Sequence, residues 1–147
     1  MLNIFEFIAI LSTTLFCGAA IYVNLAEHPA RMSCDTKTAA TVWAPSYKRA
    51  TLMQASLAIV GFLAGIAIWL IEGESLWLIG AALIGLVVPF TLVVIASTNR
   101  RLLEPGRDLS SNETRALLEK WGKLHAVRSV LSLFAASAYI SAALARH

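Results

Sequence analysis

Four long stretches without a charged side chain constrain what this sequence can fold into. They run over residues 7–23, 50–71, 75–99 and 129–145. About 20 apolar residues in an α-helix cross the hydrocarbon core of a bilayer, since each residue advances the helix by about 1.5 Å. Charged residues make up only 14% of the chain and hydrophobic residues 58%, which is more apolar than a soluble domain of this size can bury. We therefore predict an integral membrane protein.

Each stretch, extended to its polar boundaries, predicts one transmembrane helix. The four helices are expected at about 4–26, 50–71, 75–98 and 124–145, within a single domain of 147 residues. Helices of this length with short connections favour an all-α, up-down four-helix bundle. The first helix is interpreted as a retained span, because Glu6 stands where a signal peptide carries basic residues. Gly61 and Gly65 form a GxxxG motif, which permits close helix approach.

The connections carry proline and capping signals. Pro29 is expected to end or kink the first helix. Residues 30–48 are expected to form an interfacial segment, a short helix followed by a turn. Pro89 should kink the third span. An S-x-x-E capping box at residues 110–113 predicts a helix that starts near Ser111 and extends the fourth span on its cytoplasmic side.

Basic residues are concentrated in two of the three loops, and they predict the orientation. They are Arg31, Lys37, Lys48 and Arg49 after the first span, and Arg100, Arg101, Arg107, Arg115, Lys120 and Lys123 after the third. The opposite side carries Arg146. Since loops rich in Lys and Arg stay inside, we expect a bacterial inner-membrane protein with both termini outside and loops 27–49 and 100–123 cytoplasmic. The net charge is +3, but no basic stripe interleaved with aromatic residues indicates nucleic-acid binding.

Two polar clusters stand at the mouths of the first and fourth spans. Their members are spaced three and four residues apart, as on one helix face: Asn24, Glu27, His28 and Arg31, then Trp121, His125 and Arg128. In an up-down bundle both clusters lie at the cytoplasmic end, beside Tyr47, Gln54 and Asn99 of the middle spans. Charged groups at membrane depth cost about 2.5 kcal/mol or more at the bilayer centre and often mark function.

Glu27 and Arg128 are expected to pair across the bundle. An alternative is purely structural, since an ion pair also fixes the register of two helices and side chains near span ends extend to the headgroups.

Three chemical uses of these clusters stay open. In the first, His28, His125 and Glu27 bind a transition metal, although no metal-binding spacing such as HExxH is present. In the second, His125 or His28 is a general base whose tautomer is set by Glu27, while Arg128 and Asn99 stabilise an oxyanion. In the third, the pocket only binds and passes a ligand. No motif points to a nucleotide, a phosphate loop or another cofactor.

The candidate site residues follow from these uses. The candidate catalytic residues are His125, His28, Glu27 and Arg128. The candidate substrate-binding residues are Asn24, Arg31, Tyr47, Gln54, Asn99 and Trp121.

Four motifs, in order along the chain, carry a resemblance to a known family. They are Y-x-x-x-x-E-H-P-A-R at 22–31, W-x-P-S-Y-K-R-A at 43–50, T-N-R-R-L at 98–102 and W-G-x-L-H-A-V-R at 121–128. Together they are similar to the small anthrone oxygenase-like membrane proteins, most of which have no assigned function. The resemblance implies a four-helix membrane protein. For the named fungal members it also implies oxidation of a polycyclic anthrone to the anthraquinone by molecular oxygen, without bound flavin or haem.

Two functions of different classes follow. The first is a membrane oxidoreductase that acts on a lipophilic, aromatic or quinone-like substrate from the bilayer at a polar pocket near the cytoplasmic face. The second is a non-catalytic membrane protein, either a subunit of a complex or a small-ligand carrier. In both, the lipid bilayer is a partner, and a homo-oligomer or a larger membrane complex stays open.

Overall fold

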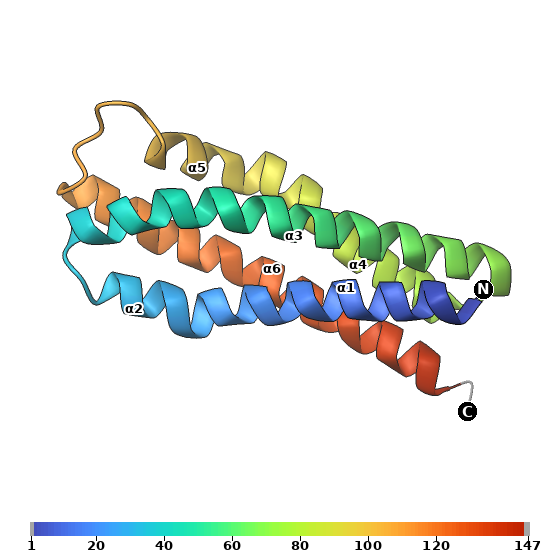
Figure 1. The fold of residues 1–147 in the computed structure, drawn as a ribbon. Coiled ribbons are helices and arrows are strands. Elements are labelled where there is room, and N and C mark those ends of the chain that lie inside the picture. Colours follow the sequence, from blue (N-terminus) through green and yellow to red (C-terminus); the bar gives the residue numbers. More distant parts are fainter. Residues whose placement is uncertain (1, 146–147) are drawn as a thin grey trace.

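The computed structural model describes residues 2–145 and contains helices and no strands over that range (Figure 1). The elements are α1 (Leu2–Tyr22), η1 (Val23–Glu27), α2 (His28–Met32), α3 (Thr36–Glu72), α4 (Ser75–Phe90), η2 (Thr91–Ile95), α5 (Ala96–Leu102) and α6 (Asn112–Leu144), where η marks a π-helical turn. They join into four rods that are long and apolar enough to cross a membrane, at 4–32, 36–72, 75–102 and 112–144. The predicted all-α class with four apolar helices is confirmed.

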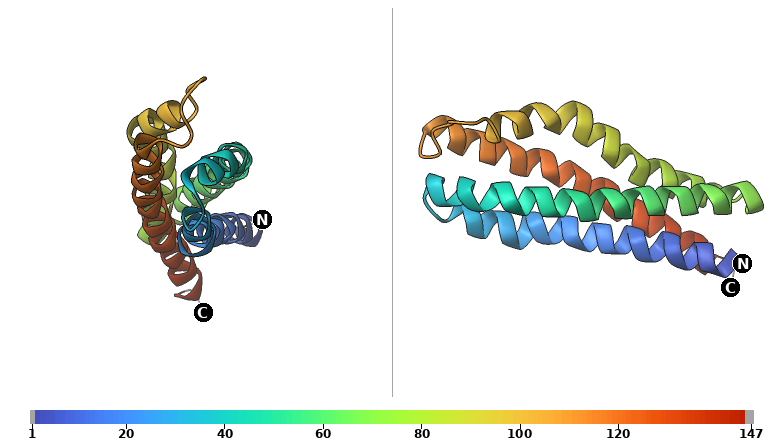
Figure 2. Two further views of the ribbon diagram at one scale, coloured as in Figure 1. Left: turned by 90° about the vertical axis from the view of Figure 1, so that its left-hand side faces the viewer. Right: turned by 45° about the horizontal axis from the view of Figure 1, so that its top comes forward.

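The rods run alternately up and down. The start of α1, the α3–α4 turn and the end of α6 lie at one end of the bundle, and the α2–α3 turn and the α5–α6 loop lie at the other (Figures 1 and 2). Three apolar clusters fill the interior along its length. The cluster around Trp43, Leu118 and Trp121 lies at the end with the α5–α6 loop, which is also where the predicted polar residues gather.

The prediction for residues 30–48 is wrong in one respect. The short helix α2 ends at Met32 and a turn at residues 33–35 follows it, but from Thr36 on the segment already belongs to α3, which runs without a break across Pro45. The helix begins early because Asp35 caps it, accepting a hydrogen bond from the Thr38 backbone N–H at 3.0 Å. This bond and another from the Thr38 hydroxyl hold the pKa of the Asp35 carboxyl below its usual value. Trp43 and Tyr47 stack across Pro45, with ring centroids 4.9 Å apart.

Two π-helical turns lie beside prolines. In η1 the His28 N–H donates to the Val23 carbonyl, one residue further back than in an α-helix. Pro29 follows without ending the helix, which continues to Met32. Pro89 precedes η2, and the rod formed by α4, η2 and α5 bends as expected for a proline inside a helix (Figure 2).

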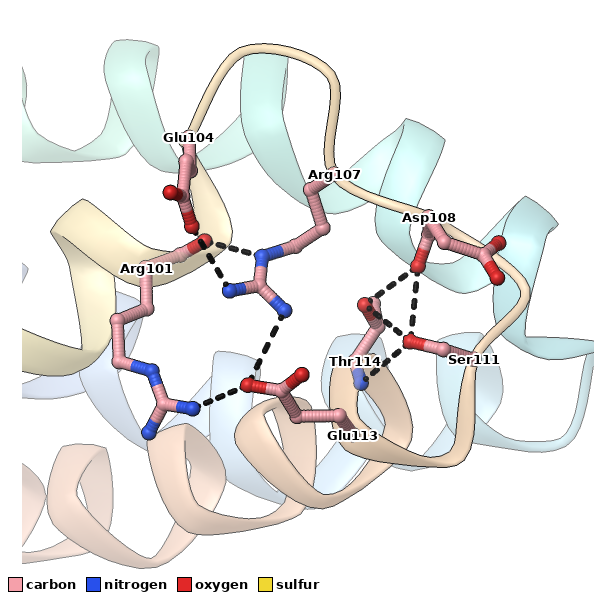
Figure 3. A network of polar contacts seen from close by, with 7 residues as sticks. All are labelled: Arg101, Glu104, Arg107, Asp108, Ser111, Glu113 and Thr114. Carbon is pink, nitrogen blue, oxygen red and sulfur yellow. Dashed lines mark hydrogen bonds and ion pairs between the residues drawn. The ribbon is translucent and has the colours of Figure 1, made fainter.

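The α5–α6 loop is held by a polar network (Figure 3). Arg107 donates to the Arg101 carbonyl and pairs with Glu104 at 3.1 Å and Glu113 at 3.6 Å. Glu113 also pairs with Arg101, so it does not close the predicted capping box. The predicted start near Ser111 is nevertheless correct, since Ser111 caps α6.

Tyr139 of α6 is fully buried where α3, α4 and α6 meet. Its hydroxyl donates to the Gly61 carbonyl at 2.9 Å, and its ring lies against Trp77 with centroids 5.3 Å apart. A Cβ atom on Gly65 or Gly80 would overlap the Tyr139 side chain. The GxxxG glycines of α3 therefore face close neighbours, as the motif indicates.

We expect Gly65→Ala to destabilise the bundle by about 1–3 kcal/mol, because a Cβ at this position overlaps the buried Tyr139 ring and hydroxyl. Thermal unfolding in detergent measures the effect as a lower Tm. Gly18→Ala is the matched control, since nothing lies within 4 Å of a Cβ there. Equal Tm values for the two variants would contradict the close packing described above.

Candidate functional site

A small polar pocket lies inside the end of the bundle that carries the α5–α6 loop. Its volume of about 10 Å³ is the space for roughly one water molecule. Seven of the ten candidate residues from the sequence line it: Glu27, Arg31, Tyr47, Gln54, Trp121, His125 and Arg128. Val23, Ser46, Ala50 and Thr51 complete its walls. The fold thus brings residues from the first, second and fourth rods to one pocket.

Asn24 joins η1 to α6 through three hydrogen bonds. Its side-chain N–H donates to the Gly122 carbonyl at 3.0 Å. Its side-chain oxygen lies 2.9 Å from His125 Nδ1 and accepts a bond from the Ser129 hydroxyl at 2.6 Å. Because this oxygen can only accept, the shared hydrogen lies on His125 Nδ1. When the imidazole is neutral, its lone pair is therefore on Nε2, which makes no hydrogen bond to the described part of the chain.

Arg128 lies deep in the bundle and pairs with a neutral side chain. It is only 6% exposed, and it donates to Gln54 Oε1 at 2.6 Å. Its guanidinium also lies over the Phe16 ring, 5.5 Å from the centroid. Its Nε is buried without a hydrogen-bond partner. Within residues 2–145 no carboxylate forms an ion pair with it.

The predicted partnership of Glu27 with Arg128 is therefore wrong. Glu27 instead pairs with Arg31, four residues later on the same rod, and accepts a hydrogen bond from the Ser46 hydroxyl. The Glu27–Arg31 pair forms in place of a Glu27–Arg128 pair because neighbouring turns of one rod place the two side chains together without any contribution from bundle packing. Glu27 also does not set the His125 tautomer, since Asn24 occupies Nδ1.

Aromatic rings form one wall of the site. Trp121 contacts both candidate imidazoles, with ring centroids 5.3 Å from His28 and 4.9 Å from His125. His28 is buried against Gly122, where a Cβ would meet its Nε2, and it lies outside the pocket lining. Asn99 is also outside the lining and donates to the Tyr47 hydroxyl at 3.0 Å.

The residues proposed for a metal do not fit one. Within residues 2–145 no three His, Cys, Asp or Glu side chains group closely enough to hold an ion. The Glu27 carboxylate is paired with Arg31, and Nδ1 of His125 is occupied by Asn24. A second guanidinium, that of Arg128, lines the same pocket and would repel a cation. The arrangement suits an anion instead.

Sequence reasoning missed Ser46, Ser129 and Phe16, which contact Glu27, Asn24 and Arg128. Ser129 follows His125 by four residues, so helical spacing offered a signal for it. Ser46 and Phe16 carry no such signal, because their roles depend on how the rods pack.

One comparison with known proteins bears on this arrangement. A family model described as anthrone oxygenase matches residues 43–138. The match includes Gln54, Trp121, His125 and Arg128, and it begins after the cluster in residues 24–31. No curated protein and no solved structure matches the chain. Since the matched segment is well over half of the 147 residues, the chain belongs to the anthrone oxygenase family.

Proposed function

We propose that this protein is a membrane-embedded oxidoreductase that removes a proton from a lipophilic aromatic substrate and lets the resulting anion react with oxygen. The observation that carries the proposal is that two buried groups, His125 and Arg128, line one pocket. His125 donates through Nδ1 and leaves Nε2 without a hydrogen bond, and Arg128 is a cation without a carboxylate partner, both within the described part of the chain.

His125 is suited to act as the general base. It is 2% exposed, and the bonds around Asn24 hold its ring in one tautomer. Fixing Nδ1–H leaves Nε2 to accept a proton, as a base requires. Trp121, packed against the ring, restricts its orientation.

Arg128 is suited to stabilise the negative charge that forms. Loss of a proton from a CH₂ group beside an aromatic ketone places charge on the ketone oxygen. A buried guanidinium stabilises such an oxyanion strongly because little water screens it. Gln54 holds one nitrogen of Arg128, which orients the donors that remain.

The oxidation itself needs oxygen and no further reductant. The carbanion forms a C–O bond with O₂, and protonation gives a hydroperoxide. Loss of water from the hydroperoxide leaves a second C=O group. In sum, one CH₂ group and one O₂ give one C=O group and one H₂O. This is the reaction expected of an anthrone, the substrate that the family description prints.

One observation favours the alternative of a non-catalytic protein, either a ligand carrier or a subunit of a complex. The polar pocket has a volume of only about 10 Å³, so a multi-ring substrate enters only if neighbouring side chains move. Under this alternative the buried polar groups fix the register of the rods, and the protein inserts without turning over any substrate.

We expect His125→Gln to lower oxygen-dependent turnover of anthrone by about 10²–10⁴-fold, the usual contribution of a general base. Oxygen uptake and anthraquinone absorbance, measured in nanodiscs against protein-free nanodiscs, report the rate. Ser137→Ala, an exposed change on the same helix, should leave the rate unchanged. Turnover by His125→Gln equal to that of the parent would remove His125 from the mechanism. A parent protein without turnover would favour the non-catalytic alternative.

We also propose that the loops around residues 33–35 and 103–111 face the cytoplasm and the termini face outward, in a bacterial inner membrane. The concentration of Lys and Arg at that end of the bundle supports this orientation.

Cys34 tests the orientation, because it is exposed in the α2–α3 turn while Cys17 is buried. A membrane-impermeant maleimide should label Cys34 in inside-out vesicles and leave it unlabelled in spheroplasts. Cys34→Ser should abolish the labelling of inside-out vesicles. Labelling of Cys34 in spheroplasts would place these loops outside and reverse the orientation.

A further inference from the structure

Two further cavities lie beside the polar pocket. An apolar groove of about 480 Å³ opens between α3 and α4, lined among others by Ile59, Phe62, Leu86 and Pro89. An inner cavity of about 80 Å³ is lined mostly by apolar side chains, together with Thr51, Thr91 and Arg128. The groove is large enough for several fused rings, since ligand pockets start at about 300 Å³.

The three cavities share walls in sequence. Ala58 and Val88 line both the groove and the inner cavity. Thr51 and Arg128 line both the inner cavity and the polar pocket. The three cavities therefore lie next to one another, separated by the side chains that they share, between the outer face of α3 and α4 and the pocket that contains His125.

The outer part of this series faces the lipid. Ile59 and Leu86 are 49% and 53% exposed, and the groove is lined almost entirely by apolar side chains. Pro89 interrupts the hydrogen bonds of α4 one turn after Gly85, where the Phe62 ring packs at the position of a side chain. The Phe62 ring therefore forms part of the groove wall, close against the backbone of α4 at Gly85.

The inner part ends on an uncompensated cation. Of the charged side chains around the polar pocket, Glu27 pairs with Arg31, which leaves the charge of Arg128 unbalanced within residues 2–145. Arg128 is 6% exposed, and its Nε has no hydrogen-bond partner. A buried charge without a counter-charge is unfavourable, so an anionic oxygen is the group that complements this end of the series.

We propose that the groove between α3 and α4 is a lateral access route, by which a flat multi-ring molecule enters from the lipid and places an anionic oxygen on Arg128. The apolar groove accommodates the rings, and the guanidinium selects the oxygen. This inference rests on the proposed function for the identity of the reacting group, but its test measures binding and needs no turnover.

Anthracene-2-carboxylate and its methyl ester are suitable probes, because they share the rings and differ in charge. Energy transfer from the Trp residues to the anthracene reports binding to the full chain in nanodiscs. We expect the carboxylate to bind at least tenfold more tightly than the ester. Arg128→Met should reduce this preference to less than threefold, and Arg128→Lys, which keeps the charge, should retain most of it.

Val88→Phe tests the route, because its ring fills the junction between the groove and the inner cavity. We expect it to weaken binding of both probes at least tenfold. Val130→Phe is the matched control, the same change at a 51% exposed position of α6, and it should bind like the parent. Circular dichroism and Tm confirm that each variant is folded.

Three results would overturn the proposal. Equal binding by Val88→Phe and Val130→Phe would exclude this route. An ester that binds the parent as tightly as the carboxylate would reduce the groove to a site for lipid chains. A carboxylate preference that persists in Arg128→Met would show that Arg128 is not the group that binds the carboxylate. The expected binding pattern in a protein without turnover would leave the route in place and contradict the proposed function alone.

Discussion

The rest of the site depends on the hydrogen bonds made by the Asn24 side chain. One amide on η1 uses its N–H on the Gly122 carbonyl and its oxygen on His125 and Ser129. These bonds connect the first and fourth rods, and loss of the Asn24 side chain would leave the buried His125 and Ser129 without this partner. They place the hydrogen of the His125 imidazole on Nδ1, while the Trp121 ring packs against the same imidazole. The chemistry proposed for the pocket therefore depends on Asn24, a side chain without a charge.

Much of this arrangement was predictable from spacing alone. The long uncharged stretches predict four rods, and therefore which ends of the rods lie together in the bundle. Trp121, His125 and Arg128 follow the α-helical period, which places all three on the buried face. The partners of these residues were not predictable in the same way. Charge complementarity favoured Glu27 for Arg128, whereas the structure pairs Arg128 with Gln54. A neutral partner gives no electrostatic signal in a sequence, and its choice depends on how two rods are rotated about their axes.

The boundaries of the elements show a related limit. Proline is a strong local signal, and it suggested an end or a kink at position 29. In the structure the helix continues through Pro29, next to a π-turn, and α3 likewise continues across Pro45, where the Trp43 and Tyr47 rings stack. Tertiary packing and neighbouring turns compensate for the backbone hydrogen bond that a proline cannot donate. Pro89 has the expected effect, since α4 bends away and the side facing α3 carries the apolar groove.

The π-turn at Val23–Glu27 has a consequence for how the first rod meets the polar pocket. A π-turn holds one residue more than an α-turn, so it changes the rotational phase of the helix along its axis. The parts before and after it keep the same α-helical period but differ in rotational phase. The extra residue therefore sets the rotational phase at which Arg31, on the part after the π-turn, meets the polar pocket.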